Sequence, residues 1–493
     1  MSEARTVNDL RYALRRLARR PSFTIVAVLT LALGIGVNTA IFSVIDAVLL
    51  RPLPYEDPDR VVRLIPEHPQ YGESDLTFSY PDLMDLRAAA DAFEGIAAQA
   101  PWNPHLRLPE GAVGLRGASV NADYFRVLGV RPAVGRFFRA DEAEPGSANA
   151  VVLSHELWVG RFGADPDVVG SEIRLGEASY TVVGVTRADF EDPRLDRGSG
   201  GWEAPQIWGS PPAYWIRDQF AEPGTRFLTA VARLGPGVTL ARAQAVASTV
   251  MDRLRVAYPD SHAGWGIRLV PLEERIVGPV RPTLLALGFA VGLVLLIACA
   301  NLANLLLARG IGRRGEIAVR VALGGSAWRI VRLVLVESVV LALAGGALGL
   351  GLMWLGADTI VALGMGRLPR LAAIGVDARI LAFTAGLSLL TALVFGCVPA
   401  RRAARVDVRA GLQAGGSGGG GRRQARLRRA LVTGEVALTV VLLAGAGLLL
   451  RSLWSLYAVE AGVQAEGALT MQVSPPFSGY ETDEWVHALY DRS

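Results

Sequence analysis

Lysine is absent from this 493-residue sequence, so arginine supplies the positive side-chain charge. Without lysine the chain cannot form a GxxxxGK(S/T) phosphate loop, in which the lysine reaches the nucleotide phosphates. The formal net charge is only +4, which is small compared with the surplus typical of proteins that bind nucleic acids. The sequence therefore predicts no phosphate-loop ATPase within these residues and no nucleic-acid partner.

Cysteine and histidine are scarce. Cys299 and Cys397 both lie inside long apolar runs, where they are expected to pack as small hydrophobic side chains rather than form a disulfide. The histidines are scattered, without the spacing of metal ligands and without a Ser/His/Asp or Cys/His pattern beside them. We therefore expect no catalytic residue, no metal and no cofactor, and structural or surface roles for the five histidines: His68, His105, His155, His262 and His487.

Long apolar runs are abundant, and hydrophobic residues make up 51% of the chain. A helix needs about 20 apolar residues to cross a hydrocarbon core of roughly 30 Å. The first run is too long for a signal-peptide core and no small-residue cleavage site follows it, so it is expected to remain as an anchor. About five membrane spans are predicted, namely Phe23 to Ile45 and the runs between Arg281 and Arg309, Arg332 and Asp358, Arg379 and Arg401, and Arg429 and Arg451.

Arginine clusters predict the orientation of these spans, because short basic flanks remain in the cytoplasm. One cluster precedes the first span, a second follows the second span at 309–320, and a third joins the fourth and fifth spans at 401–429. The N-terminus is therefore predicted to be cytoplasmic. The predicted regions are a basic segment 1–20, a span 21–50, an extracytoplasmic domain 51–282, a three-span permease domain 283–400 with an inner loop 309–328, a linker 401–430, a span 431–450 and an incomplete second extracytoplasmic segment 451–493.

The extracytoplasmic segment is long enough for its own core and has mixed α+β patterning. Alternating apolar residues predict a strand at Val61 to Ile65. A hairpin is predicted from Ile173 to Leu175 and Tyr180 to Val185, joined across Gly176 and Glu177. Gly129 should end the second of four helices. These helices are expected to follow the capping residues Ser79, Asn121, Ser154 and Thr239.

Two glutamates and two small-residue motifs stand out within the spans. Glu337 and Glu435 each lie less than two helical turns beyond an arginine, so an ion pair or a snorkelling contact is favoured over a proton relay. Gly345 to Gly349 forms a GxxxG motif, and Ala32 with Gly36 forms a similar pair in the first span. Such spacing permits close helix packing, although chance matches are frequent in a glycine-rich chain.

The inner loop and its flanks carry the most informative pattern. A span ends in arginines, an amphipathic segment with Ile317, Val321 and Ala322 on one face follows, and Gly-Gly-Ser precedes the next helix. The segment is either an ordinary basic loop at the membrane surface or a docking element for a cytoplasmic partner. The stretch Gly411 to Gly421 is expected to be a flexible linker.

Several long motifs resemble one family. The runs RRGEIAVRVALGG, VESVVLALAGGALG and VPARRAARVDV resemble the permease module of MacB/FtsX-type ABC transporters. The runs ASVNADYFRVLGVRPAVGRFF and VVLSHELWVGRFGADPDVVGSEIRLGEASYTVVGVTRADF are similar to the MacB-like periplasmic core domain of that class. The chain is most similar to the acidobacterial duplicated orphan permeases (ADOP), which repeat the whole layout. Since a second half is missing here, the chain is expected to be a fragment or a truncated permease.

The resemblance implies a bacterial inner-membrane permease without its own nucleotide-binding domain. It implies that the segment from Arg314 to Ser326 is a coupling helix for a separate cytoplasmic ATPase, with Glu316, Arg320 and Gly324 matching its pattern. ATP-driven motion of the extracytoplasmic domain, called mechanotransmission, would export a drug, peptide or lipoprotein, with a periplasmic adaptor as a further partner. The alternatives are a regulator that activates a cell-wall hydrolase or relays a signal, and a membrane-anchored enzyme, which the lack of a catalytic pattern disfavours.

We predict that a reporter enzyme fused at Gly418 is active only in the cytoplasm, because the third arginine cluster flanks this position. The measurement is a paired fusion of two reporters, one active in the cytoplasm and one active outside it. Activity of the external reporter alone would contradict the predicted topology.

Overall fold

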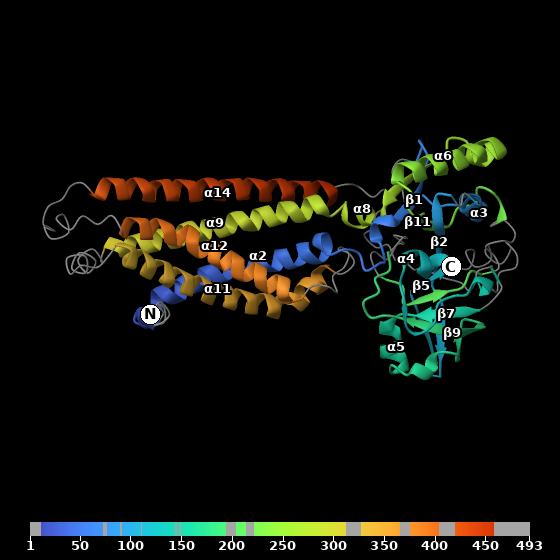
Figure 1. Ribbon diagram of the computed structural model, residues 1–493, viewed down its shortest axis with the longest axis horizontal. Helices are drawn as coiled ribbons and strands as arrows, with labels where there is room; N and C mark the ends of the chain where they lie inside the picture. Colours follow the sequence, from blue (N-terminus) through green and yellow to red (C-terminus); the bar gives the residue numbers. More distant parts are fainter. Residues whose placement is uncertain are drawn as a thin grey trace, which may run out of the picture. The chain divides into compact units, whose positions relative to one another are not determined.

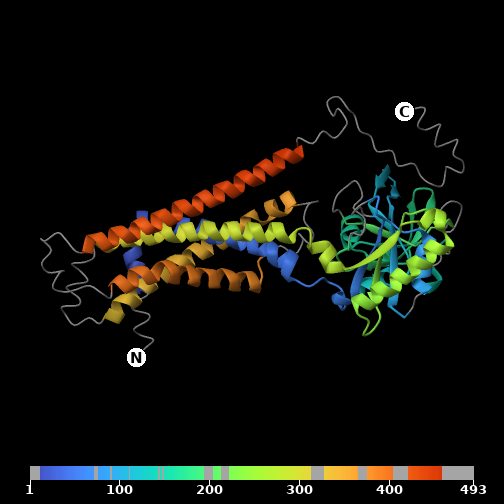
Figure 2. The same ribbon diagram turned by 90° about the horizontal axis from the view of Figure 1, so that it is seen from above.

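The computed structural model describes residues 11–71, 76–88, 91–109, 111–142, 145–146, 149–193, 204–212, 221–311, 327–364, 375–403 and 420–457. The described chain forms two compact units (Figures 1 and 2). Residues 11–50 and the described residues from Val280 onward form the helical unit. The described residues from Arg51 to Pro279 form the sheet domain.

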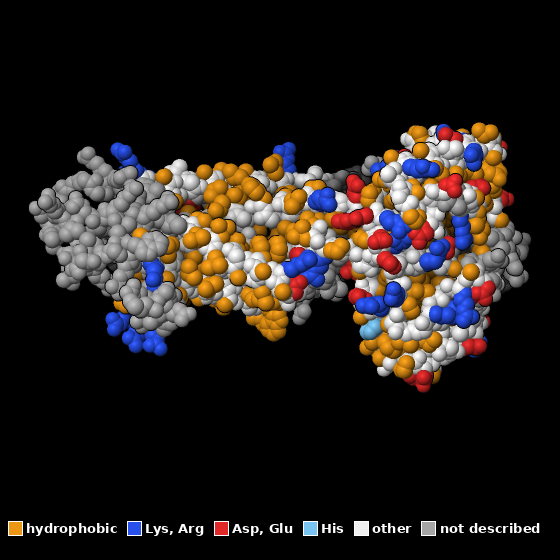
Figure 3. Space-filling model, in the orientation of Figure 1, with side chains coloured by type: hydrophobic (Ala, Val, Ile, Leu, Met, Phe, Trp, Pro, Cys, Tyr) orange, Lys and Arg blue, Asp and Glu red, His pale blue; other side chains and the backbone are white. Residues whose placement is uncertain are grey.

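Long apolar helices build the helical unit. Each begins or ends close to arginine, and hydrophobic side chains cover the helices where Figure 3 shows their surface. All five contain a stretch long and apolar enough to cross a membrane, which confirms the predicted helical class and number of spans. The helices are α2 (Pro21–Ile45), α9 (Arg281–Ile311), α11 (Ala327–Gly364), α12 (Ala378–Ala403) and α14 (Gly420–Tyr457).

Helix α2 is packed among α9, α11 and α12, and a five-residue π-helical turn, Asp46–Leu50, extends it. The core of the unit includes Leu31 and Ile35 of α2 together with Cys299 of α9, so this cysteine packs as a small apolar residue. The side chain of Cys397 lies outside the described residues. Helix α14 lies along α9, and no residue of its span window is buried in the helical unit.

Helix α14 begins at Gly420, within the last two residues of the stretch Gly411 to Gly421 that the sequence predicts as a flexible linker, and continues through the arginines before the span. Arginine has a high helix propensity, so a basic segment can extend an apolar helix beyond the membrane. The rest of that stretch lies outside the described residues.

The sheet domain is built on one twelve-stranded sheet of the described residues, in the order β12-β1-β11-β2-β5-β10-β7-β9-β8-β3-β4 with β6 paired to β9. Most neighbours are antiparallel, while β5 with β10 and β7 with β9 are parallel. The strands are β1 (Val61–Glu67), β2 (Phe93–Trp102), β3 (His105–Leu108), β4 (Gly111–Gly114), β5 (Gly117–Val120), β6 (Pro132–Gly135), β7 (Ala150–Leu153), β8 (Glu172–Leu175), β9 (Ala178–Thr186), β10 (Ile207–Gly209), β11 (Thr229–Leu234) and β12 (Gly266–Pro271).

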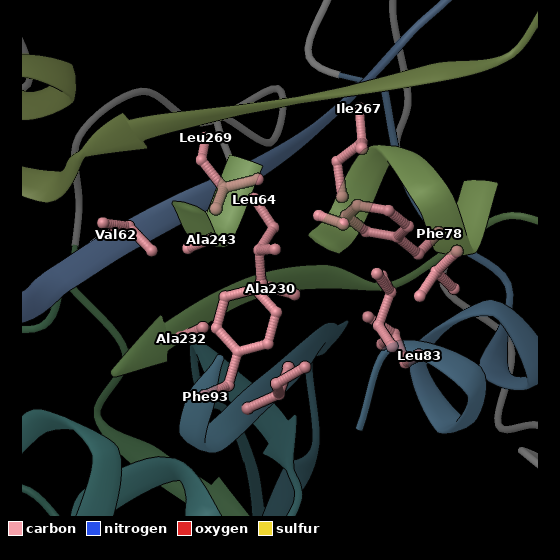
Figure 4. Close-up of a cluster of buried hydrophobic side chains, with 14 of the residues drawn as sticks. Val62, Leu64, Phe78, Leu83, Phe93, Ala230, Ala232, Ala243, Ile267 and Leu269 are labelled. Carbon is pink, nitrogen blue, oxygen red and sulfur yellow. The ribbon is translucent and has the colours of Figure 1, made fainter. Parts of the chain in front are cut away.

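Two apolar cores lie along this sheet. The first packs side chains of β1, β2, β11 and β12 against those of α3 and α6, and it includes Leu64 of β1, Leu83 of α3 and Phe78, which precedes α3 (Figure 4). The second joins β7, β8 and β9 to α5 through residues such as Leu153 and Leu157. The helices of the domain are α3 (Tyr80–Ala88), α4 (Asp123–Leu128), α5 (His155–Phe162), α6 (Leu240–Ala257), α7 (Pro259–His262) and α8 (Leu272–Val277).

Local sequence signals account for much of this arrangement. The hydroxyl of Ser154 accepts the Leu157 N–H and that of Thr239 accepts the Arg242 N–H, which caps α5 and α6 as predicted. Helix α4 ends at Gly129 with φ of 67°, a left-handed conformation that glycine adopts without strain. Strands β8 and β9 form the predicted hairpin.

Asn121 is the exception among the predicted caps. Helix α4 begins two residues later, at Asp123, and its N-cap residue is Ala122. The side chain of Asn121 instead bonds the backbone of β2, where its Oδ1 accepts the Ala98 N–H and its Nδ2 donates to the Ile96 carbonyl. Both backbone groups are buried, so pairing them is worth more than capping a short helix.

A second buried network joins Tyr124 of α4 to Trp208 of β10 through Asp192. The Tyr124 hydroxyl lies 2.7 Å from Asp192 Oδ2, and the Trp208 indole N–H donates to the same oxygen at 3.0 Å. Burial, followed by the nearby Asp192 carboxylate, raises the pKa of Tyr124. The hydroxyl therefore stays protonated and can act as a donor.

We predict that residues 55–275 expressed alone form a soluble domain that melts cooperatively, and that Asn121→Ala destabilises it. The substitution leaves two buried backbone groups unpaired, at a cost of about 1 to 3 kcal/mol each. Differential scanning calorimetry should show a melting temperature lower by several degrees. The matched control is Asn149→Ala, at an exposed position, which should melt like the unmodified domain. Equal melting temperatures for both variants would contradict this role of Asn121.

Candidate functional site

Helices α2 and α11 touch backbone to backbone along a seam of small residues. A methyl group added at Gly349 would lie 2.7 Å from the Ala32 carbonyl oxygen and 2.8 Å from the Gly36 nitrogen. A methyl group at Gly345 would lie 2.5 Å from Leu31 Cβ. Real side-chain carbons do not approach other atoms so closely, so only glycine fits at these positions. The structure thus brings together the two small-residue motifs that the sequence predicts for close packing.

Polar contacts continue the attachment of α2 beyond the glycine seam. The hydroxyls of Thr39 and Thr384 lie 3.1 Å apart and are buried between α2 and α12. Asn38 Nδ2 donates to the Val291 carbonyl of α9 at 2.9 Å. Such interhelical hydrogen bonds satisfy polar groups that lipid cannot. Helix α2 is therefore bonded to two further helices of its unit.

Asp46 closes this set of contacts at the end of α2. It is only 2% exposed, and its Oδ1 lies 3.4 Å from Arg379 Nη1 at the start of α12. One turn earlier, the rings of Phe42 and Phe383 stack with centroids 3.8 Å apart. A buried carboxylate requires such a partner, because desolvation without one is costly. The ion pair fixes where α2 ends relative to α12.

Glu337 lies near the opposite end of the bundle. It is 3% exposed, and its Oε2 lies 3.8 Å from Nη1 of Arg16, which belongs to the helical segment before α2. This contact links α11 to the N-terminal segment. Glu435 of α14 is half-buried and has no ion-pair partner among the described residues.

The predicted coupling residues Glu316, Arg320 and Gly324 lie outside the described residues, as does the apolar face around Ile317. His487, near the C-terminus, also lies outside them. No group of three or more potential metal ligands is found in the described part of the chain.

The sheet domain contains a row of hydrogen-bonded side chains that the spacing of residues along the sequence could not reveal. Asp82 Oδ1 lies 2.8 Å from His262 Nε2, and His262 Nδ1 lies 2.8 Å from Ser261 Oγ. The expectation that no Ser/His/Asp constellation exists is therefore wrong for the folded chain. Asp82 is separated from the other two residues by some 180 positions, which no local motif bridges.

The position of this chain argues for a structural role. His262 is 0% exposed, and its serine partner is the preceding residue rather than a group facing it across a cleft. Asp82 also accepts the Ser79 N–H, while the Asp82 N–H donates to the Ser79 hydroxyl. This reciprocal pattern is the capping box of α3. The hydrogen bond between Asp82 and His262 thus connects α7 to the start of α3.

We predict that Gly349→Leu destabilises the full chain in detergent, because the new side chain would occupy the space of the α2 backbone. Overpacking of this kind typically costs about 1 to 3 kcal/mol, and more where backbone must move. Gly351→Leu is the matched control, since a methyl group there meets nothing within 4 Å on the same helix. The measurement is thermal unfolding monitored by size-exclusion chromatography, and Gly349→Leu should unfold at a lower temperature than Gly351→Leu. Indistinguishable melting would contradict the tight seam.

Comparison with known proteins identifies both units. Residues 24–250 match the model of the MacB-like periplasmic core domain, and residues 288–408 match that of the FtsX-like permease C-terminal domain. The periplasmic region of MacB from Actinobacillus actinomycetemcomitans covers 45% of this chain and 92% of its own, at 13% identity and a TM-score of 0.33.

Curated relatives are similar to this chain over more than half of its length. A macrolide export ATP-binding/permease protein MacB from Shewanella oneidensis is 26% identical over 309 residues, which are 61% of this chain and 44% of the relative. The Escherichia coli K12 protein of that name is 27% identical over 342 residues, which are 69% of this chain and 49% of the relative. The chain thus spans less than half the length of these relatives. With a MacB-like periplasmic core domain followed by an FtsX-like permease domain, the chain belongs to the MacB/FtsX-type ABC transporter permease family.

Proposed function

We propose that this chain is the permease component of an ABC exporter in which ATP hydrolysis by a separate cytoplasmic ATPase moves the sheet domain. The observation that carries the proposal is the glycine seam between α2 and α11. Helix α11 begins at Ala327, directly after the segment that resembles a coupling helix, and α2 runs into the sheet domain through the residues that follow Leu50. The seam therefore joins the helix that follows this segment to the helix that leads into the sheet domain.

The packing of α2 supports transmission of movement through this helix. Interdigitated backbones cannot slide past each other without separating, since packed interfaces have discrete arrangements rather than continuous ones. A displacement of α11 would therefore carry α2 with it. Because α2 is covalently joined to the strand β1, the sheet domain would receive that displacement at the start of its first strand.

The distribution of charge supports the same mechanism over passage of a polar substrate through the spans. The carboxylates within the described spans are Asp46, Glu337 and Glu435, and each lies within about two turns of a span end. Two of them are buried against an arginine. Polar transport routes usually place ionisable groups facing a cavity deep in the membrane.

The orientation, localisation and partners of the chain are part of this proposal. The chain is a multi-pass membrane protein by its helices and its family. The arginine clusters favour a cytoplasmic N-terminus, which would place the sheet domain in the periplasm. One relative is named a pyoverdine export ATP-binding/permease protein, from Pseudomonas syringae pv. tomato, 26% identical over 277 residues. For this chain we infer export of a drug, peptide or lipoprotein with a periplasmic adaptor, and membership of the duplicated orphan permeases.

We predict that Glu316→Ala and Arg320→Ala each weaken association with the partner ATPase. A charged contact buried at that interface would contribute about 1 to 3 kcal/mol. Co-purification and ATPase activity are the measurements, made on the chain together with a candidate ABC ATPase. Both variants should retain the melting profile of the sheet domain, because they change residues in a different unit.

The control for this experiment is Arg423→Ala, which removes a similar charge from the basic segment before the fifth span. If all three variants bind and stimulate the ATPase like the unmodified chain, the inner loop is only a basic surface loop and the proposed coupling is wrong. If the chain binds the ATPase and activates a cell-wall hydrolase, but no substrate is exported, the regulatory alternative is favoured instead.

A further inference from the structure

A short helical segment, residues 11–18, precedes α2 in the helical unit (Figure 1). It is a separate helix, because Arg20 takes non-helical backbone angles (φ −136°, ψ 68°) before Pro21 starts α2. A proline disfavours the helical conformation of the residue before it. The corner is fixed by the Leu17 carbonyl, which accepts the Arg20 N–H at 3.1 Å and the Thr24 hydroxyl at 2.9 Å.

One side of this segment is buried against the helical unit. Ala13 is 0% exposed, and Leu17, at 6%, belongs to the same core as Leu31 of α2. Arg16 adds the ion pair with Glu337 of α11. The segment is therefore attached to the spans and is part of their folded unit.

The rest of the segment's surface is basic. Arg11, Arg15 and Arg19 recur at every fourth position, so they lie on one side of a helix, and Arg20 follows them. All four side chains are exposed, and none of them has an ion-pair partner among the described residues. Figure 3 shows arginine side chains gathered where Figure 1 places the described N-terminal end. Residues 1–20 contain six arginines against two acidic residues, so this part of the chain cannot neutralise its own charge.

Apolar side chains are exposed beside these arginines. Leu14 is 49% exposed and Tyr12 is 38% exposed. The stretch long enough to cross a membrane begins directly after the segment, at Pro21, so the segment lies at the depth of the lipid headgroups. A helix with an apolar side and an arginine-rich side is suited to this depth, because its apolar side chains reach the acyl chains while its guanidiniums stay among the headgroups.

The headgroup that complements this surface is anionic. A guanidinium forms paired, charge-assisted hydrogen bonds with phosphate oxygens. In a zwitterionic lipid the choline cation offsets the phosphate, whereas the phosphate of phosphatidylglycerol keeps its net negative charge. Each arginine close to an anionic membrane surface strengthens binding by about fivefold, so several unpaired arginines on one short helix discriminate strongly between the two lipids.

We propose that residues 11–20 form an interfacial helix that binds the phosphate groups of anionic phospholipids through Arg11, Arg15 and Arg19, with Leu14 among the acyl chains. The proposal requires that the helical unit span a membrane. It requires neither the coupling to an ATPase nor a cytoplasmic N-terminus, so its failure would leave the proposed function untouched, and the reverse also holds.

The test compares two lipids with equal acyl chains, dioctanoyl phosphatidylglycerol and dioctanoyl phosphatidylcholine, titrated into the full chain in a nonionic detergent. Native mass spectrometry counts the bound lipids. Phosphatidylglycerol should bind at least about tenfold more tightly, and the double variant Arg15→Gln, Arg19→Gln should lose most of this preference. In Leu14→Gln both lipids should bind more weakly by a similar factor, since the acyl chains are common to both.

The matched control is the double variant Arg161→Gln, Arg174→Gln, which removes the same charge from two exposed arginines of the sheet domain. It should retain the preference for phosphatidylglycerol. Equal affinity for the two lipids, an unchanged preference in the Arg15 and Arg19 variant, or an equal loss in the control would each overturn the proposal.

Soluble glycerol phosphate separates a lipid site from a site for free phosphate. It should fail to displace phosphatidylglycerol at equal concentration, because it lacks the acyl chains, and displacement would overturn the proposal. Thermal melting checks that the variants fold, as expected for exposed arginines without ion pairs. If the Arg15 and Arg19 variant does not fold, Arg11→Gln takes its place and should bind phosphatidylglycerol about fivefold more weakly.

Discussion

Backbone contact between α2 and α11 is the constraint on which the helical unit depends. In lipid there is no hydrophobic force to bring two apolar helices together, so close packing and interhelical hydrogen bonds must do so. Gly36 and Gly349 allow the two backbones to meet, which maximises dispersion contacts and leaves no room for side chains between them. Helix α2 also precedes the first strand of the sheet domain in the chain, so the seam holds one of the two helices that connect to that domain, the other being α9.

The ion pairs near the ends of the bundle complement this contact. Arg379 compensates Asp46 at the end of α2, and Arg16 lies beside Glu337 near the start of α11. Their positions match the physical requirement that carboxylates within a span be paired, and that long arginine side chains reach toward water. The pairs restrict rotation and sliding of α2 at both ends, while the glycines hold its middle. The first pair joins the end of α2 to α12, the second joins the segment before α2 to α11, and the glycine seam holds α2 against α11 between them.

The sheet domain follows a different rule, because water supplies the driving force for its two cores. Its buried polar groups serve mainly to join elements that are distant in sequence: Asn121 bonds β2, and Asp82 joins the cap of α3 to α7. Nearly every such group has its partners supplied. Among the described residues of this domain, Asp123 Oδ2 and Arg226 Nη2 depart from that pattern, since both are buried without a hydrogen-bond partner.

The sequence by itself determined the features that depend on nearby residues. Apolar runs bounded by arginine specified the five spans, and hydroxyl caps, the hairpin across Gly176 and the left-handed Gly129 specified local structure in the sheet domain. Only the tertiary structure decided which segments meet. The sequence marked both glycine motifs but not that they pack on each other, and it favoured an ion pair or a snorkelling contact for Glu337 without indicating that Arg16 lies beside it. It read Asn121 as a cap and missed the pairing of Asp82 with His262. Contacts between residues far apart in the chain leave no periodicity or spacing, because they depend on how whole elements pack and not on their neighbours in sequence.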